Sequence, residues 1–498
     1  MRTLRLASEH LARFAEASGD WNPLHVDEQF ARRTPYGRCI AHGALVTIAA
    51  LGSADENTLR HAQALDVQFK QPVYPEDEYH VAIVEETEEK VRIEATRGGR
   101  LALSVAITVD PAVALTDGPL EKPSFASDAP RVYTLEELAT GETTIAEPYG
   151  ADVAALSALA AELGADQIPT AVLQWLAAAS FTVGMLLPGR DALFAGGRIV
   201  RSPARNAGEL TASVEAADDR TGFVSVVASL AAGEASSDLT LHTFLRPPVP
   251  EPDRERIARF LAPSMVLDGR KVLVVGASRG LGAAVAGALA TQGANVWIGY
   301  ARSTEQAERL RDEFDAERIR LLQFDAADAA QAAEAFAALR AEAGELDGVV
   351  LSAAPPLGDA ALHPDGSRGT LDFVASSVAT ALVPLAEALE LLSADGWLVI
   401  MSSSALDDPP ESWPHYVVAK AALEGAAAYC ARQSPIRVIV VRAPKTWTDS
   451  TNTPMGRIGA AEKEQIAAAI VRHVLDADAT GRPELLTAEQ LTEAGARA

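Results

Sequence analysis

Hydrophobic and polar positions alternate with two different rhythms along this chain. Up to about residue 246, short stretches alternate between apolar and polar positions, which predicts antiparallel strands, and helical stretches precede them. From about residue 265, continuous apolar runs alternate with long Ala-rich segments, which is the pattern of a parallel doubly wound sheet. The change of rhythm therefore predicts two kinds of fold in one chain of 498 residues.

The antiparallel part divides into two similar halves. In the first half, Leu11–Ala17 and Ile40–Leu51 predict helices, and in the second Asp152–Leu163 and the apolar stretch 168–187 do the same. Four strand-like stretches follow in each half: DVQFKQPVY, EYHVAIVEETE, KVRIEATRG and LALSVAITVD, then ALFAGGRIVRS, GELTASVEAADD, FVSVVASLAAG and SSDLTLHTFL. An internal repeat of this length indicates duplication.

The boundaries between these parts are rich in Pro, Gly and charged residues. DPAVALTDGPLEKPS and RPPVPEPDRER read as linkers. We therefore expect domains at 1–118, 130–247 and 262–498. In the last of these the predicted strands are KVLVVGAS, NVWIGY, IRLLQFD, DGVVLSAA, GWLVIMSSS and, as the final strand, RVIVVRAP.

Composition and charge exclude several classes of binding partner. A formal charge of −25 repels phosphate backbones, so we expect no nucleic-acid partner. No apolar run approaches the roughly 20 residues of a membrane span, and the N-terminus lacks a signal peptide, so we expect a cytoplasmic protein with no membrane partner. The two cysteines, Cys39 and Cys430, exclude a disulfide framework and a Cys-rich metal site, and we predict no metal.

Two short strings in the first half combine residues suited to proton transfer. Asp20 and His25 stand five residues apart in SGDWNPLH, and Ala-His-Gly follows at 41–43, at the head of the apolar helix. Gly19 and Pro23 exclude a regular helix across the pair and predict a turn that aims both side chains at one point. Such a pair can hold a water molecule and move protons to and from adjacent carbons. The alternative is a helix end followed by an Asn-Pro turn, with His25 on the surface.

The complete string S-G-D-x-N-P-L-H, with A-H-G downstream, resembles the signature of MaoC-like hotdog dehydratases, also called the hydratase 2 family. The resemblance covers the whole first half. It implies that Asp20 and His25 handle the water and the proton at C2 and C3 of an enoyl thioester. It also implies that Asn22 supports the site and that the Gly43 backbone N–H polarises the thioester carbonyl. The implied substrates are (3R)-3-hydroxyacyl thioesters of CoA or acyl carrier protein.

The second half is similar to a hotdog that lacks this chemistry. It has no S-G-D, no N-P-x-x-H and no His-Gly before its apolar helix. We expect it to complete the sheet and shape an acyl tunnel, with Asp166 as an acid that no motif supports. The predicted fold class is an α+β double hotdog followed by an α/β Rossmann-like doubly wound parallel sheet.

A glycine-rich turn, GASRGLG, follows the first apolar strand of the last part and opens a helix. Glycines let the backbone turn tightly and approach a pyrophosphate, whose charge a helix N-terminus favours. The predicted cofactor-binding residues of this turn are Gly276, Ser278, Arg279, Gly280 and Gly282. The spacing G-x-x-x-G-x-G is a moderate signal alone, since glycine-rich turns also occur without ligands.

A second signal in this part is Tyr416-Val-Val-Ala-Lys420, whose outer residues share one helix face. A lysine cation beside a phenol favours the phenolate, which suits the tyrosine to proton transfer. Ser403, at the end of a predicted strand, could hold a substrate carbonyl beside Tyr416.

Together these residues resemble the short-chain dehydrogenase/reductase family over the whole last part. The resemblance implies that Tyr416 is the general acid, that Lys420 binds the ribose and that Ser403 positions the carbonyl. Asp325 then corresponds to the adenine contact, and Pro444 and Thr448 to the loop near the nicotinamide.

The last part also departs from that family's pattern. Leu351–Ala354 replaces N-N-A-G, Ser376 or a neighbour stands where an active-site asparagine is usual, and Pro444-Lys445 replaces P-G. These changes affect the expected proton relay and the cofactor loop, and they leave the Ser/Tyr/Lys core in place.

The cofactor preference follows from the end of the second predicted strand, NVWIGYARS. It carries no acid for the ribose hydroxyls, and Arg302 and Ser303 lie just beyond it. Arg302 and Arg279 can clamp a 2′-phosphate, so we predict NADPH; the alternative is that both are solvated surface residues.

The two resemblances predict a bifunctional 3-ketoacyl reductase and 3-hydroxyacyl dehydratase of fatty-acid- or polyketide-like synthesis. One alternative is the reverse flow, hydration followed by oxidation, as in β-oxidation, and NAD preference would favour it. The other is an acyl- or carrier-binding scaffold with one or both sites inactive. We expect a homo-oligomer formed through the last domain.

Overall fold

A computed structural model describes residues 2–112, 114–115, 123–125, 129–141, 143–358, 360, 362–364, 367–476 and 483–496. The chain divides into two units. The first comprises residues 1–248 with the short segment 453–455, and the second comprises 249–452 with 456–498. The boundary near residue 248 falls inside the Pro-rich segment RPPVPEPDRER.

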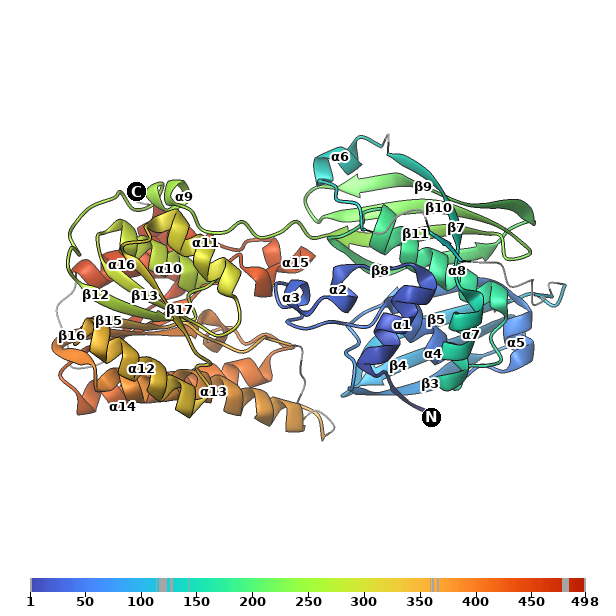
Figure 1. Ribbon diagram of the computed structural model, residues 1–498. Coiled ribbons are helices and arrows are strands. Elements are labelled where there is room, and N and C mark those ends of the chain that lie inside the picture. The colour runs from blue at the N-terminus through green and yellow to red at the C-terminus, as the bar shows by residue number, and fades with distance from the viewer. Residues whose placement is uncertain are drawn as a thin grey trace. The chain divides into compact units, whose positions relative to one another are not determined.

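The first half of the first unit places an apolar helix of nine residues beside antiparallel strands (Figure 1). Its helices are α1 (Ser8–Ser18), α2 (Pro23–Val26), α3 (Glu28–Ala31), α4 (Gly43–Leu51) and α5 (Glu56–Arg60). Its strands are β1 (Arg2–Arg5), β2 (Ala62–Phe69), β3 (Glu78–Glu86), β4 (Lys90–Arg97) and β5 (Arg100–Val109). The predicted helix at 40–51 thus begins at Gly43, and β1 was not foreseen.

The second half repeats this order. Its helices are α6 (Leu135–Ala139), α7 (Val153–Glu162) and α8 (Thr170–Phe181), which continues as a π-helical turn, Thr182–Leu186. Its strands are β6 (Ser124–Phe125), β7 (Thr144–Gly150), β8 (Ala192–Arg201), β9 (Arg205–Asp218), β10 (Phe223–Gly233) and β11 (Ser237–Leu245). The sequence predicted α7, α8 and the last four strands, but not β6 and β7.

One eleven-stranded sheet joins the two halves, in the order β1-β3-β4-β5-β2-β8-β11-β10-β9-β7-β6. The junction is an antiparallel ladder between β2 and β8, in which Ala64 faces Val200 and Gln68 faces Gly196. Helices α4 and α8 pack against each other, and residues 44–51 of α4 are all buried. A helix that is apolar all round must be buried, and the contact between α4 and α8 buries part of each.

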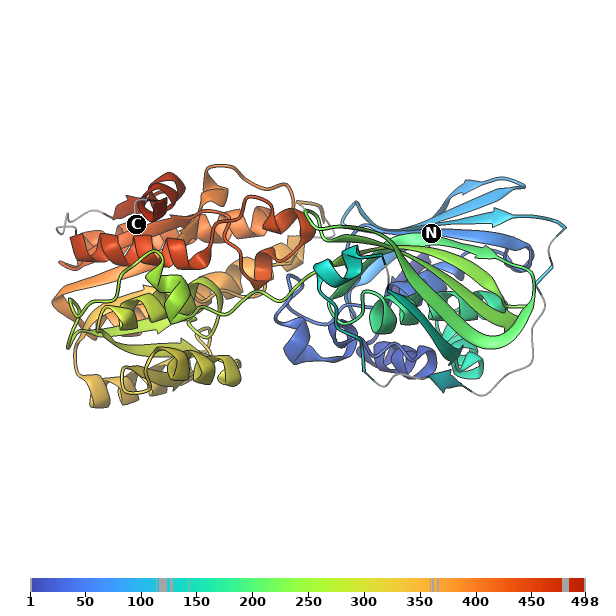
Figure 2. The ribbon, with the colours of Figure 1, turned by 90° about the horizontal axis from the view of Figure 1, so that it is seen from above.

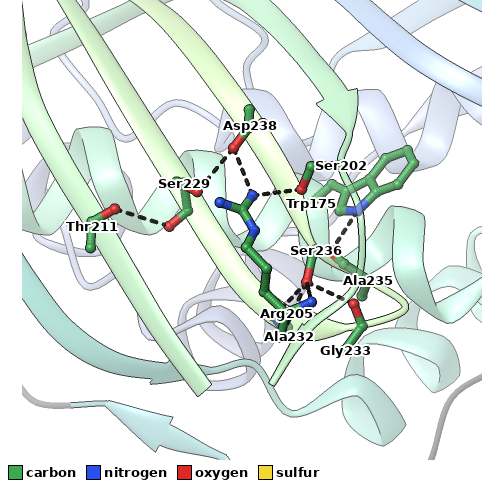
Figure 3. Close-up of polar contacts among 10 residues, drawn as sticks. All are labelled: Trp175, Ser202, Arg205, Thr211, Ser229, Ala232, Gly233, Ala235, Ser236 and Asp238. Carbon is green, nitrogen blue, oxygen red and sulfur yellow. Dashed lines mark hydrogen bonds and ion pairs between the residues drawn. The ribbon is translucent and has the colours of Figure 1, made fainter. Parts of the chain in front are cut away.

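A polar cluster attaches α8 to the far strands of its own half (Figure 3). The indole N–H of the fully buried Trp175 donates to the carbonyl of Ala235, in the turn between β10 and β11, over 2.8 Å. In the neighbouring strands, Arg205 pairs with Asp238 over 2.7 Å and donates to Ser202 over 2.6 Å. A buried indole N–H needs such a partner, so this contact links α8 to the turn between β10 and β11.

The second unit is a parallel sheet of seven strands in the order β14-β13-β12-β15-β16-β17-β18. The strands are β12 (Lys271–Val275), β13 (Asn295–Tyr300), β14 (Ile319–Gln323), β15 (Leu346–Leu351), β16 (Leu392–Ser403), β17 (Arg437–Ala443) and β18 (Glu484–Leu486). The parallel, doubly wound sheet was predicted. The expectation that RVIVVRAP is the final strand was wrong, because β18 pairs with β17 at the sheet edge.

Helices cover both faces of this sheet, as two separate cores and Figures 1 and 2 show. On one face lie α10 (Gly280–Thr291), α11 (Thr304–Phe314) and α16 (Lys463–Asp476), and on the other α12 (Ala329–Ala343), α13 (Ser367–Leu389) and α14 (Pro414–Gln433). The shorter helices are α9 (Arg254–Ala258), α15 (Pro454–Arg457) and α17 (Ala488–Ala496).

One described helix departs from the expectation of no membrane-length apolar run. α13 is long and apolar enough to cross a membrane by length and composition alone, with a mean hydropathy of 1.4. In the structure it packs beside α12 and α14, and only 22% of its apolar window is buried. Its exposed apolar side chains are Leu371, Leu382 and Leu389.

Candidate active sites

The first candidate site begins where α1 ends. The Ser18 hydroxyl donates to the carbonyl of Phe14 over 2.7 Å and accepts from the Asp20 N–H over 3.2 Å. Gly19 adopts a left-handed conformation with φ of 76°, and a Cβ at this position would lie 2.5 Å from the Phe125 ring. Only glycine satisfies both conditions, which accounts for the Ser-Gly-Asp order.

Asn22 turns the chain into α2. Its side-chain carbonyl accepts from the Leu24 N–H over 3.0 Å, as an N-cap does, and Pro23 follows as the first helical residue. Its side-chain amide lies within 3.2 Å of three carbonyls of the second half, at 184, 189 and 190. Asn22 therefore ties the turn that carries Asp20 and His25 to the segment after α8.

Asp20, His25 and His42 form one cluster in which a polar side-chain atom of each lies within 4.8 Å of the others. The Nδ1–H of His25 donates to the carbonyl of Ile40 over 2.8 Å, which leaves Nε2 as the acceptor in the neutral ring. The Nε2–H of His42 donates to the Asp20 carbonyl over 3.0 Å. The two imidazole rings are 3.9 Å apart between centroids.

Burial moves the pKa values of the cluster in opposite directions. It raises the pKa of Asp20 to about 7, although hydrogen bonds from Ser180 and Asn22 oppose this shift. It lowers the pKa of His25 to about 4 and holds the pKa of His42 well below its ordinary value. Between about pH 4 and about pH 7, therefore, the Asp20 carboxyl is protonated and the His25 imidazole is neutral.

A pocket of the first unit opens onto this cluster. Residues of both halves line it, among them Asp20, His25, Gly43, Ser180, Gly184 and Phe194. Gly43 begins α4, so its backbone N–H has no partner within the helix. A Cβ at Gly43 would lie 2.5 Å from the Phe69 ring, so a side chain there would collide with the pocket wall.

Asp20 and Asp166, the two candidate acids of the first unit, lie in different surroundings. Asp20 is buried in the cluster, whereas Asp166 is exposed and does not line the pocket. Sequence reasoning missed Ser180, whose hydroxyl donates to Asp20 Oδ2 over 2.6 Å. No motif surrounds Ser180, so only the packing of α8 against the first half identifies it.

The second candidate site begins at the glycine turn after β12. A Cβ at Gly276 would lie 2.4 Å from the Ala353 Cα, and one at Gly282 would lie 2.3 Å from the Gly276 carbonyl oxygen. Gly280 begins α10 with φ of 62°. Ser278 and Arg279 lie half-buried within the turn. A turn this tight brings the helix N-terminus and its N–H groups close to a pyrophosphate, so the residues fit a dinucleotide.

The residues predicted to select the cofactor lie at the ends of β13 and β14. Arg302 is exposed just beyond β13, and Ser303 precedes α11. Asp325 follows β14, and its Oδ1 accepts from the Ala327 N–H over 3.0 Å. Arg279 forms an ion pair with Asp449 over 3.4 Å, a contact that the sequence did not suggest.

Lys420 and Tyr416 of α14 lie beside the end of β16, the strand that carries Ser403. The buried Lys420 ammonium donates to the carbonyl of Met401 over 2.7 Å and lies 5.4 Å from the centre of the Tyr416 ring. Ser403 is the last residue of β16, and its hydroxyl accepts from the Ala405 N–H over 3.1 Å. The strand thus places a hydroxyl two residues beyond the carbonyl that anchors the lysine.

The loop after β17 lies next to the glycine turn. Pro444 begins it, and Thr448 is close enough that a Cβ at Gly280 would lie 3.7 Å from the Thr448 methyl group. In α13 the structure exposes Ser376 and buries its neighbour Ser377. Ser377 is therefore the inward-facing hydroxyl in the part of α13 where the family's asparagine is usual.

Comparison with known families agrees with this geometry. Residues 2–104 match the MaoC like domain, and residues 276–484 match the family described as Enoyl-(Acyl carrier protein) reductase. The chain joins a MaoC-like dehydratase domain to a short-chain dehydrogenase/reductase domain. Both resemblances predicted from the sequence are confirmed.

The curated relatives are similar over short segments, and a solved structure is similar over nearly half of the chain. A 3-hydroxybutyryl-CoA dehydratase of Methylorubrum extorquens is 53% identical over 38 residues, which is 8% of this chain and 24% of the relative. Versicolorin reductase of Emericella nidulans is 55% identical over 47 residues, 9% of this chain and 18% of the relative. A dehydrogenase/reductase structure from Sinorhizobium meliloti is 25% identical with a TM-score of 0.41, covering 46% of this chain and 97% of that one.

Proposed function

We propose that the second unit reduces 3-ketoacyl thioesters and that the first unit dehydrates the (3R)-3-hydroxyacyl product to an enoyl thioester. The observation that carries this proposal is the shared pocket of Asp20, His25 and Gly43, in a chain that also assembles Ser403, Tyr416 and Lys420. The thioester carrier is CoA or acyl carrier protein, in fatty-acid- or polyketide-like synthesis. The product of the reductase chemistry is the substrate of the dehydratase chemistry.

The proton positions define the roles in the first site. In the hydration direction, neutral His25 accepts a proton from water at Nε2 as the water oxygen bonds to C3, and protonated Asp20 donates its proton to C2. The Gly43 N–H stabilises negative charge on the thioester oxygen. Dehydration reverses these steps: Asp20 removes the C2 proton, and protonated His25 gives its proton to the leaving hydroxyl.

In the second site the chain's own residues handle the carbonyl. Ser403 donates a hydrogen bond to the ketone oxygen, and Tyr416 donates the proton that completes the alcohol. Lys420 binds the ribose of the cofactor in this proposal, and its ammonium lies 5.4 Å from the centre of the Tyr416 ring. The nicotinamide cofactor supplies the hydride when it is bound.

NADPH is the proposed cofactor. β13 ends at Tyr300 without an acid, and Arg302 is exposed immediately beyond it, where a 2′-phosphate needs a cation. Arg279 is a second cation in the glycine turn, and it also forms an ion pair with Asp449. NADH preference would instead favour hydration followed by oxidation, the reverse flow.

We also propose that the two halves of the first unit are two copies of the hotdog fold, the second without catalytic residues. Both place an apolar helix beside four consecutive antiparallel strands, and β2 and β8 join them edge to edge. Pairing within one chain covers a sheet edge that a single copy would expose. The proposed domains are therefore 1–118, 130–247 and 262–498.

The reductase unit is the proposed oligomerisation surface. Leu371 and Leu382 on α13, with Val418 and Tyr429 on α14, leave apolar side chains exposed on two helices that pack together. Exposed apolar side chains on adjacent helices favour association with another copy. Light scattering of the full chain tests this, and a monomer at all concentrations would contradict it.

Mass spectrometry of products tests the proposed reactions. Acetoacetyl thioesters of CoA and of acyl carrier protein, supplied with NADPH or NADH, should yield 3-hydroxybutyryl and then but-2-enoyl thioesters. In a His25→Ala variant the hydroxyacyl product should accumulate as the 3R isomer. A predominantly 3S product would show that the two units do not catalyse successive steps, and no reduction of any ketone would support the scaffold alternative.

A further inference from the structure

Ser180 differs from the other buried hydroxyl at the end of α8. A serine or threonine inside a helix usually bonds to the carbonyl four residues earlier. Thr182 does so, donating to the Ala178 carbonyl over 2.7 Å. Ser180 is 4% exposed and instead donates across the two halves to Asp20 Oδ2 over 2.6 Å.

The backbone beyond Ser180 also approaches Asp20. α8 widens into the π-helical turn Thr182–Leu186, a departure that is frequent at functional sites. A Cβ at Gly184, inside this turn, would lie 2.1 Å from Asp20 Oδ1. The carboxyl therefore has the Ser180 hydroxyl at one oxygen and the backbone of Gly184 close to the other.

We propose that Ser180 is a positioning residue of the dehydratase site, whose hydroxyl fixes the rotation of the Asp20 carboxyl and helps to set when that carboxyl releases its proton. The inference rests on the proposed hydration chemistry of Asp20 and His25. It assigns to the second half a direct part in the site, beyond closing the sheet.

The surroundings of Asp20 define what Ser180 can change. Among the residues that the structure describes, the titratable groups that face Asp20 are His25 and His42 of the first half and Tyr149 of β7. Burial raises the pKa of Asp20, and the hydrogen bond from Ser180 lowers it. When the hydroxyl is lost, the hydrogen bond that lowers the pKa of Asp20 is lost too, and the pKa rises further.

The test compares Ser180→Ala with Thr182→Val in the full chain, since each loses one buried hydroxyl of the same helix end. Hydration of but-2-enoyl-CoA is measured across pH, with thermal unfolding as a check of folding. Hydration needs protonated Asp20, so its rate falls at alkaline pH. The pH of this fall should rise by roughly one unit in Ser180→Ala. It should stay in place in Thr182→Val and be restored in Ser180→Thr.

An unchanged pH of this fall in Ser180→Ala, or an equal shift in Thr182→Val, would overturn the role of Ser180 alone. If the unsubstituted protein hydrates no enoyl thioester, the proposed function falls together with this inference. Gly184→Ala provides a second measurement that does not depend on the hydroxyl. Its Cβ would displace the Asp20 carboxyl, so hydration should be lost while ketone reduction persists, and full hydration in this variant would contradict the proposed support of Asp20.

Discussion

The two sites of this chain differ in the origin of the atoms that support them. Asp20 accepts from Ser180, 160 residues away in the sequence, and Asn22 binds three carbonyls of the second half. Lys420 finds its carbonyl partner at Met401, 19 residues away, in the strand that precedes its own helix. The lysine of the reductase site is thus anchored inside one strand–helix unit, whereas Asp20 and Asn22 of the dehydratase site bind groups of the second half. Removing a half should therefore affect only one of the two activities.

The largest effect is expected from deleting residues 130–246 from the full chain. This removes β8 from the edge of β2 and uncovers α4, both unfavourable in water. Hydration should fall below detection, while the reductase unit, whose sheet is complete, keeps reducing ketones. Activity assays on the soluble fraction check this. A soluble and fully active fragment of residues 1–118 would contradict the dependence on two halves.

Point substitutions should separate the two activities. Tyr416→Phe removes the proposed proton donor and should lower ketone reduction by roughly 10²- to 10⁴-fold, the usual contribution of general acid catalysis, with hydration unchanged. Asp20→Asn and His25→Ala should do the reverse. Steady-state rates of both reactions on each variant measure this. Loss of hydration in folded Tyr416→Phe would show that the sites are not independent.

The pH dependence should also distinguish the sites. Burial raises the pKa of Asp20 to about 7, so the carboxyl is protonated below that pH and hydration should be fast there. Above about pH 7 the proton is lost, and hydration should fall by about tenfold per pH unit. The measurement is kcat/KM for an enoyl thioester at constant ionic strength. A hydration rate that rises through this range would reverse the assigned roles of Asp20 and His25.

A smaller effect is expected at the cofactor end of the reductase unit. Arg302→Ala should weaken NADPH binding by about tenfold, or roughly 1.4 kcal/mol, and leave NADH binding nearly unchanged. The matched control is Arg309→Ala, which removes an exposed arginine that pairs with Glu305 on α11. Titration of each cofactor by fluorescence measures both constants. Equal losses for NADPH and NADH would show that Arg302 does not contact the 2′-phosphate.

The smallest effect is expected at Asp166. The residue is exposed and outside the pocket, so Asp166→Ala should change hydration by less than about twofold. Asp20→Asn, assayed in parallel, provides the large effect against which this result is judged. A loss at Asp166 comparable to that at Asp20 would show that the second half carries its own acid.

Much of the fold was predictable because its signals are local. The strands of both units follow period-two or continuous apolar patterns, and α4 and α8 are recognisable as predominantly apolar stretches. The strands β1, β6, β7 and β18 were missed. β18 is three residues long and lies at a sheet edge, where neither length nor alternation provides a pattern.

By itself the sequence determined the residues whose geometry depends on their immediate neighbours. Gly19 needs a left-handed backbone, Asn22 caps the next turn, and Tyr416 and Lys420 share a helix face. Backbone dihedrals and hydrogen bonds over a few residues act here regardless of the rest of the chain. A motif of this kind can therefore be recognised from its residues and their spacing alone.

Only the tertiary structure decided which distant groups meet these residues. Ser180 and Gly184 reach Asp20 because β2 pairs with β8 in one register and α8 packs on α4, and Arg279 meets Asp449 because the loop after β17 lies beside the glycine turn. Such contacts depend on the packing of whole elements, whose register no single residue specifies. The raised pKa of Asp20 has the same origin, since burial within the two-half core is its largest cause.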